Sequence, residues 1–345
     1  MGIYTVREDE AVDKVIAKDL EFIVNRVREA LPVRAIILGG GFGRGEGSVL
    51  IDNAGIRAVN DYDVFLVISD NDQINVKALS CDMAMQLGIR SIDLITIRYS
   101  ELERLPATQV YYDLKYGGTL LWGENVLDQI PQYKQGCVDH RSAETLLLNR
   151  LVCALEAFSE KFVYNGMSTE ERFFLVNQTG KVVSACVEAL LMGRGKYHHR
   201  YSERRNIFDA EFPNWDTLRR LNRQATAFKL MPSETANIDA IAYWNGMVTE
   251  YIKVLVIYFA PRSLQSTLGL WGRLAFDRRN PISDNPIEIL ELMLLLGWRA
   301  SFLPRHYVLS QLRRRLEHIS NRTFSCVEWE PLRAGAVQLW HQLCH

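Results

Sequence analysis

The sequence predicts an α+β fold in which a small mixed sheet covered by helices is followed by an all-α helical domain. Short apolar runs rich in Ile, Leu and Val indicate strands in the first third of the chain. Segments with apolar residues at helical spacing flank these runs. Beyond residue 139 the patterns are helical, with prolines near their ends. We therefore expect a sheet domain at residues 1–123, a linker at 124–138 and a helical domain at 139–345.

The first domain is expected to combine helices and strands. Glu8–Leu31 predicts one amphipathic helix, because its apolar residues recur every three or four positions, and Pro32 ends it. Gly88 is expected to stop a second helix, since glycine readily takes the left-handed conformation at a helix end. In chain order we expect the helix Glu8–Leu31, the strands Ala35–Leu38 and Val64–Ile68, the helix Gln73–Leu87, the strand Ser91–Ile97, a helical stretch Glu101–Lys115 broken at Pro106, and the strand Thr119–Trp122.

The second domain is expected to be helical throughout. Prolines mark the ends of most of its segments, because proline is tolerated in the first turn of a helix and not in its interior. The expected helices are Ser142–Phe162, Glu170–Met192, Trp215–Leu230, Ser233–Phe259, Ser263–Phe276, Pro286–Leu296, Pro304–Ile319 and Pro331–Leu343.

Composition narrows the class of protein. The 345 residues, 48% of them hydrophobic, suffice for a large core in two domains. Forty basic and 41 acidic residues give a formal net charge of −1, which offers no global attraction to nucleic acid or to a membrane surface. The six cysteines show no metal-site or disulfide-framework spacing, and no apolar stretch reaches about 18 residues. A cytoplasmic protein with reduced thiols and no membrane partner is expected.

A glycine-rich run follows the first predicted strand directly. Six of the nine residues Gly39–Gly47 are glycine, so main-chain N–H groups can approach a ligand closely and cradle phosphate oxygens. Arg44 adds a planar, permanently charged group that suits phosphate. The run contains neither the Gly-x-x-x-x-Gly-Lys motif nor Gly-x-Gly-x-x-Gly. It therefore lacks the sequence motifs of P-loop proteins and of dinucleotide-binding proteins. A flexible turn between strand and helix is the alternative.

Three acids follow on two predicted strands. Asp61 and Asp63 stand at the start of one strand and point to the same face, because side chains alternate along a strand. Asp93 lies inside the apolar run Ser91–Ile97, where a lone charge is costly to bury without a partner such as a metal ion. Carboxylates are ligands that Mg²⁺ prefers. We expect Asp61, Asp63 and Asp93 to hold two Mg²⁺ ions, with Mn²⁺ as an alternative, and to be the catalytic residues.

These residues resemble the nucleotidyltransferases of the DNA polymerase β superfamily, whose pattern is an apolar strand, Gly-Gly or Gly-Ser, Arg-Gly, an Asp-x-Asp pair and a third acid. The resemblance covers roughly residues 33–123, and Tyr116–Gly123 is similar to the segment that closes this domain in aminoglycoside nucleotidyltransferases. From Gly41 to Asp61 the chain advances 20 positions, more than is usual in that family. The surplus is assigned to a loop, Ser48–Asn60, which would be a lid or a substrate-specific insertion.

The resemblance implies transfer of a nucleoside monophosphate from a nucleoside triphosphate, with ATP expected, to a hydroxyl acceptor, with release of pyrophosphate. A small-molecule acceptor is favoured over RNA or a protein side chain; a nucleotide-sensing or antitoxin-like module without chemistry is the alternative from another class. Helical domains of the family often supply a Lys to the phosphates, and Lys181 is the candidate here. The expected nucleotide-binding residues are therefore Gly40, Gly41, Gly43, Arg44, Gly45 and Lys181.

A basic run interleaved with aromatic residues, Arg194–Arg205, follows a predicted helix. Its cations would hold phosphates and its aromatic rings would stack on a base, or else the run is a solvated surface loop. Arg194 and His199 also fit the loose Arg-x(4–6)-His pattern of helical ribonuclease domains, which arises readily by chance.

Overall fold

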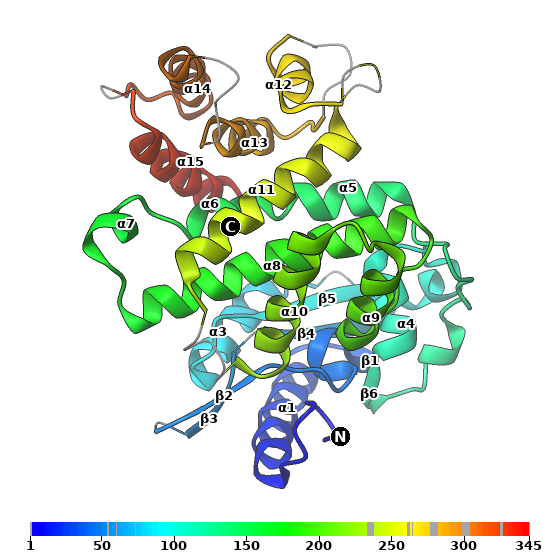
Figure 1. Cartoon of the computed structure of the whole chain (residues 1–345). Helices are drawn as coiled ribbons and strands as arrows, with labels where there is room; N and C mark the ends of the chain where they lie inside the picture. The colour runs from blue at the N-terminus through cyan, green and yellow to red at the C-terminus, as the bar shows by residue number, and fades with distance from the viewer. Residues whose placement is uncertain are drawn as a thin grey trace. The chain divides into compact units, whose positions relative to one another are not determined.

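The computed structural model describes residues 2–53, 55–59, 61–72, 74–232, 238–260, 263, 265–276, 282–298, 304–324 and 327–344 (Figure 1). The chain forms two compact units. The linker expected at residues 124–138 stays a prediction, but two segments from the second half of the sequence belong to the same unit as the sheet. The first unit comprises Met1–Asp139, Arg194–Ala210 and Thr226–Ala236, and the second comprises His140–Gly193, Glu211–Ala225 and Asn237–His345.

The first unit is built on a four-stranded sheet with strand order β5-β4-β1-β6. Strand β4 pairs in parallel with β5 and antiparallel with β1, and β1 pairs antiparallel with β6, so the sheet is mixed as expected. All four strands predicted from the sequence are present, each within two residues of its expected start. Their bounds are β1 Val33–Leu38, β4 Tyr62–Ile68, β5 Ile92–Arg98 and β6 Thr119–Gly123.

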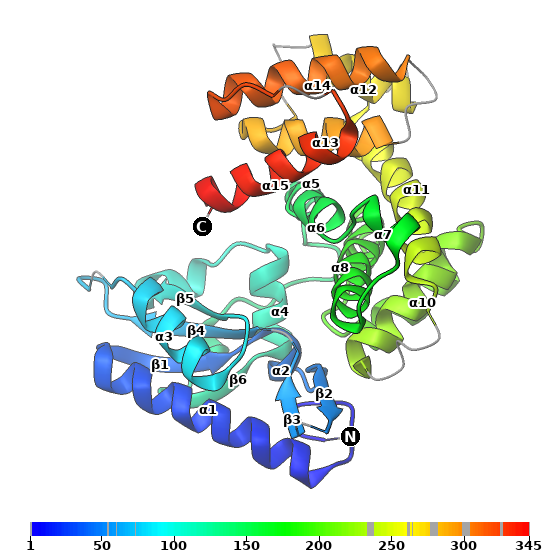
Figure 2. The same ribbon diagram turned by 90° about the vertical axis from the view of Figure 1, so that its left-hand side faces the viewer.

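Helices cover both faces of this sheet (Figure 2). Ile36 and Leu38 of β1 belong to one core with α1 and α3, whereas Ala35 and Ile37 belong to a second core with Leu102 and Leu114 on the other face. This division follows the alternation of side chains along a strand. The helices of this part are α1 Glu10–Ala30, α3 Lys77–Leu87, the 3₁₀ segment η1 Tyr99–Arg104, α4 Gln109–Gly117 and the 3₁₀ segment η2 Leu127–Gln129.

Two local predictions for this part have different outcomes. Gly88 ends α3 in the left-handed conformation, with φ of 64°, as expected. The segment Ser48–Asn60 was expected to be a loop, and this is wrong: it contains the hairpin of β2 (Val49–Asp52) and β3 (Gly55–Ala58). Apolar side chains on both arms and a glycine with φ of 118° at the start of β3 allow this short antiparallel pair.

In the described part of the second unit all regular secondary structure is helical. Its core contains an aromatic pair, Phe158 and Trp244, whose rings stack 3.9 Å apart. The single helix expected at Ser142–Phe162 is wrong, because the structure divides it into three short helices. The helices are α5 His140–Leu148, α6 Leu151–Glu156, α7 Lys161–Asn165, α8 Thr169–Gly193, most of α10 Asp216–Leu230, α11 Ala240–Phe259, α12 Thr267–Phe276, α13 Pro286–Trp298, α14 Arg305–Ser320 and α15 Trp329–Cys344. Residues 233–237 of the expected helix Ser233–Phe259 lie outside the described residues, as does Leu264 of the expected helix Ser263–Phe276, which in the structure begins at Thr267.

The basic run contains a helix that the sequence analysis missed, α9 (Tyr201–Glu211). Together with the last turn of α10, from Thr226, this segment belongs to the first unit. Within the described residues, no helix combines the length and apolar character needed to cross a membrane.

Candidate active site

The three acids come together at one end of the sheet. Asp63 is the second residue of β4 and is paired in register with Asp93 on the parallel strand β5. Asp61 stands directly before β4, two positions from Asp63 and therefore on the same side of the strand. Tyr62 between them is fully buried on the other side, and its hydroxyl donates to Asp19 of α1 over 2.8 Å. The packing of Tyr62 thus fixes which way the two carboxylates point.

The glycine run reaches the same place. Leu38, the last residue of β1, pairs with Val64 of β4, so the residues after β1 arrive beside Asp63. The Gly39 N–H donates to the Asp63 carbonyl over 2.7 Å. The run then forms a single helical turn, α2 (Gly40–Gly43). The N–H groups of Gly40 and Gly41 lie in its first turn, where no intrahelical carbonyl can accept from them.

The surroundings of the Asp63 carboxyl group disfavour its ionised form. Burial, followed by the neighbouring charges of Asp61 and Asp93, raises its pKa from the ordinary 3.8 to about 7. Lys229 and Arg44 oppose this shift, and they do not outweigh it. A carboxylate cluster with too little positive charge around it favours the binding of a further cation.

The acids alone do not form a closed metal cage. Among the described residues, no group of three or more His, Cys, Asp or Glu side chains is arranged to hold a metal ion by itself. Mg²⁺ is commonly held by one or two carboxylates together with substrate phosphates and water. The donor set of oxygen atoms on Asp61, Asp63 and Asp93, with its excess of negative charge, fits a hard divalent cation of this kind.

Glycine is required at position 40 by the approach of Asp63. Gly40 has φ of 57°, and a Cβ built on it would lie 1.7 Å from the Asp63 Oδ2 atom. Gly43 is also crowded, since a Cβ there would lie 2.4 Å from the Leu38 carbonyl oxygen. The glycines therefore let the turn press against the acid cluster.

We expect Gly40→Ala to displace the Asp63 carboxylate and to weaken metal-dependent ligand binding at least tenfold. Gly88→Ala is the matched control: Gly88 has a similar φ of 64°, but a Cβ there has nothing within 4 Å. In both variants alanine adopts the left-handed backbone conformation, which destabilises the fold by about 1 kcal/mol. Binding of Mg²⁺ with a nucleotide, measured by calorimetry, should fall only in Gly40→Ala. Equal effects in the two variants would contradict this role of Gly40.

The predicted phosphate ligand Arg44 is engaged with protein groups. Its side chain is 5% exposed, and its Nη1 atom lies 3.0 Å from Oδ2 of Asp113. Arg204 of α9, equally buried, lies 3.0 Å from the same carboxylate oxygen, and the Tyr197 hydroxyl donates to it as well. Arg44 thereby ties the glycine run to α4 and α9. Gly45, next to it, has φ of 74°.

The two lysines differ in where the structure places them. Lys181, the lysine predicted to reach the phosphates, lies in α8 of the second unit. Lys229, in the last turn of α10, belongs to the first unit and acts electrostatically on Asp63. Its Nζ atom lies 5.5 Å from the ring centroid of Tyr201. Lys229 therefore contributes positive charge to the surroundings of the acid cluster.

Three residues of this site were not predicted from the sequence: Glu46, Asp113 and Lys229. Arg204 was predicted only as one cation of the basic run Arg194–Arg205. Asp113 and Lys229 lie in helical patterns without a motif. Glu46 had a detectable signal, because Arg44, Glu46 and Ser48 alternate with single glycines. All three polar side chains are buried in the structure, although Arg44 and Gly45 lie in a turn in which Gly45 has φ of 74°.

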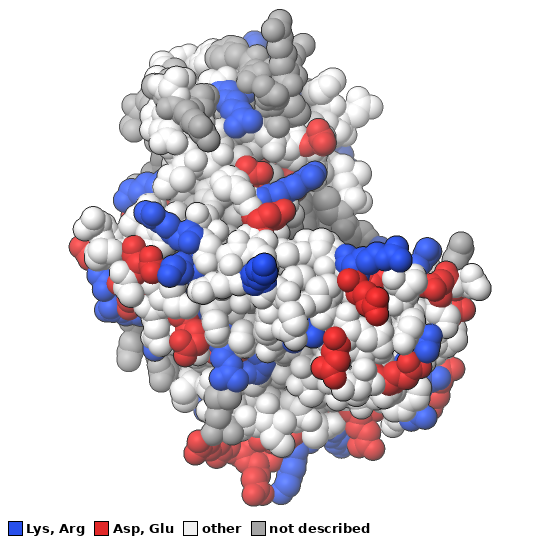
Figure 3. All heavy atoms as spheres, turned by 90° about the vertical axis from the view of Figure 1, so that its right-hand side faces the viewer, with Lys and Arg blue, Asp and Glu red and all other residues white. Residues whose placement is uncertain are grey.

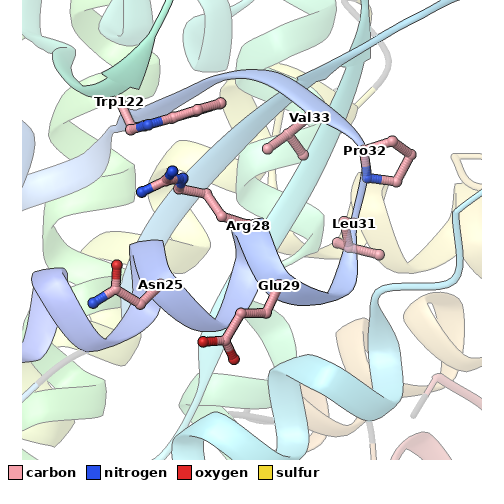
Figure 4. A pocket seen from close by; sticks show the side chains of 7 residues that line it. All are labelled: Asn25, Arg28, Glu29, Leu31, Pro32, Val33 and Trp122. Carbon is pink, nitrogen blue, oxygen red and sulfur yellow. The ribbon is translucent and has the colours of Figure 1, made fainter.

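Two other surface features do not belong to the acid cluster. A hollow of about 470 Å³ is lined by the end of α1, the start of β1 and Trp122, with Arg28 over the Trp122 ring at 4.7 Å (Figure 4). Val33 in this hollow pairs with Ile68, so the hollow lies at the opposite end of β4 from Asp63. On the face drawn in Figure 3, basic and acidic side chains are interspersed, in keeping with the formal net charge of −1.

No protein-family model matches this chain, and no curated protein does.

Proposed function

We propose that this protein is a Mg²⁺-dependent nucleotidyltransferase, which moves a nucleoside monophosphate from a nucleoside triphosphate to a hydroxyl group and releases pyrophosphate. The observation that carries the proposal is the convergence of Asp61, Asp63 and Asp93 on a glycine turn that contacts Asp63 so closely that no Cβ fits. A purely structural acid cluster would not need a glycine turn pressed this closely against one of its carboxylates. The resemblance of these residues to the polymerase β superfamily points to the same chemistry.

Each group of the site has a role in this proposal. The amides of Gly40 and Gly41 donate to phosphate oxygens, and Lys229 supplies a positive charge beside the acids. Asp61, Asp63 and Asp93 would hold Mg²⁺, which when bound lowers the pKa of the acceptor hydroxyl and offsets charge on the leaving pyrophosphate. The remaining contribution of the protein is to orient the triphosphate and the acceptor. Arg44 keeps the turn in place through Asp113.

The acceptor is proposed to be a small hydroxylated molecule, with ATP as the nucleotide. The near-zero net charge supports a small acceptor over RNA. The only support for RNA is the basic run Arg194–Arg205, and one of its cations, Arg204, is 3% exposed and paired with Asp113. A cytoplasmic location is proposed on the six cysteines, whose spacing shows no disulfide framework.

The test is a calorimetric titration of ATP, GTP, CTP and UTP into the wild-type protein and into Asp61→Ala/Asp63→Ala, each with and without Mg²⁺. A pyrophosphate assay with a pool of cell metabolites follows. We expect one triphosphate to bind only with Mg²⁺, binding to be lost in the double variant, and pyrophosphate to appear. Metal-independent binding without pyrophosphate would identify a nucleotide-sensing module instead. Absence of any triphosphate binding would reject both proposals.

A further inference from the structure

The segment Arg44–Ser48 connects three parts of the first unit. Its three polar side chains have exposed fractions of 8%, 2% and 1% for Arg44, Glu46 and Ser48. Each contacts a different element: α4 through Asp113, the first turn of α9, and the backbone carbonyl of Lys229. Burial of two charges and a hydroxyl requires that most of their polar atoms are paired. The Arg44 Nε atom has no hydrogen-bond partner among the described residues and lies 3.7 Å from Oε2 of Glu46.

The Glu46 side chain caps the N-terminus of α9, a helix that is remote from it in sequence. Its carboxylate accepts from the Tyr201 N–H over 2.7 Å and from the Ser202 N–H over 3.2 Å. The Ser202 hydroxyl donates to it over 2.9 Å. These N–H groups open α9 and have no intrahelical acceptor, and a carboxylate also interacts favourably with the positive end of the helix. Glu46 therefore fixes where α9 begins and where the Tyr201 ring lies.

Lys229 is held at both of its ends by this arrangement. Its backbone carbonyl accepts from the Ser48 hydroxyl. Its ammonium faces the Tyr201 ring at 5.5 Å, within the range of a cation–π interaction. A lysine side chain has four rotatable bonds and considerable rotamer entropy, so two anchors restrict where its charge can lie. The charge that they restrict is the one that opposes the anionic repulsion at Asp63.

We propose that Glu46 is a positioning residue of the nucleotide site: by capping α9 it holds Tyr201, and through Tyr201 it holds the Lys229 ammonium beside the acid cluster. This inference rests on the proposed function, because it assigns Lys229 to the triphosphate. It predicts that Glu46 contributes to nucleotide affinity without touching the nucleotide, and that its contribution disappears when Lys229 is absent.

The test is a double-mutant cycle on ATP affinity with Mg²⁺, using Glu46→Gln, Lys229→Met and the two combined. We expect each single variant to weaken binding about tenfold, and the double variant to bind no more weakly than Lys229→Met alone. Losses that multiply in the double variant would overturn the proposal. Tyr201→Phe and Tyr201→Leu form a matched pair: the first keeps the ring and should bind as the wild type does, whereas the second should match Glu46→Gln.

A second measurement does not depend on nucleotide chemistry. Amide hydrogen exchange of peptides that cover the first turn of α9 should accelerate at least tenfold in Glu46→Gln, while peptides from β4 stay unchanged. Unchanged protection of α9 would overturn the proposal whatever the protein binds. If the wild type binds no triphosphate, the proposed function fails and the exchange result still decides whether Glu46 caps α9. If Glu46→Gln does not fold, Tyr201→Leu replaces it in the cycle with the same expected non-additivity.

Discussion

Asp63→Asn is expected to lower turnover by at least about a thousandfold, because the transition state loses a metal-binding charge worth about 4 kcal/mol. The same substitution is expected to stabilise the metal-free protein. The folded-state pKa of Asp63 is raised from 3.8 to about 7, so the folded protein binds more protons than the unfolded chain between these values. The stability of the wild type therefore falls as the pH rises through this window. The Asp63→Asn variant has no ionisable group at this position, so its stability does not fall for this reason. Pyrophosphate release at saturating substrate, and thermal unfolding between pH 4 and 8 without Mg²⁺, measure the two effects.

Asp70→Asn is the matched control, two residues beyond the other end of β4. Asp70 has its pKa lowered by hydrogen bonds from the Ser100 side chain and backbone, so its charge favours the folded state. We expect unchanged turnover and a slight loss of stability above pH 5, the opposite of Asp63→Asn on both counts. Near-normal turnover of Asp63→Asn would show that the acid cluster does not perform the proposed chemistry. A loss of stability at pH 8 in Asp63→Asn would show that its carboxylate is not under repulsion.

Asp113→Ala is expected to destabilise the fold by about 3 kcal/mol or more, because it leaves two buried guanidinium groups without their shared carboxylate. Arg44 and Arg204 have side chains 5% and 3% exposed, and each lies 3.0 Å from the Asp113 Oδ2 atom. Their remaining contacts, with Glu46 and with backbone carbonyls, compensate only part of the lost charge. Urea unfolding followed by circular dichroism gives the free energy of unfolding.

Asp52→Ala removes an ion pair of the same length from an exposed site. The Arg57–Asp52 pair also spans 3.0 Å, but its side chains are 59% and 35% exposed. Its loss should cost between about 0 and 1 kcal/mol, since water screens the charges. If the two substitutions cost the same, the network around Asp113 is not the buried anchor of the glycine run that its contacts indicate.

Local sequence patterns were sufficient for most regular elements of the sheet unit. Alternating and continuous apolar runs marked the strands, and Gly88 marked the end of α3, because these signals arise from neighbours along the chain. The hairpin within 48–60 was missed, since its two arms have only four residues each and each arm has two exposed residues. The interruption of the helix expected at Ser142–Phe162 was also missed, because a bend between α5, α6 and α7 depends on packing.

The sequence by itself determined that an apolar strand leads into a glycine run and that three acids follow on later strands. Covalent order and side-chain alternation fix these features, and they place Asp61 and Asp63 on one face. Only the tertiary structure decided which cationic side chains lie near the acid cluster. Arg44 forms an ion pair with Asp113. Lys229 lowers the pKa of Asp63 by its positive charge, although it lies 168 positions after Asp61 in the sequence. That selection depends on where α9 and the last turn of α10 pack, and such long-range packing leaves no signature in the residues that surround Lys229 in the chain.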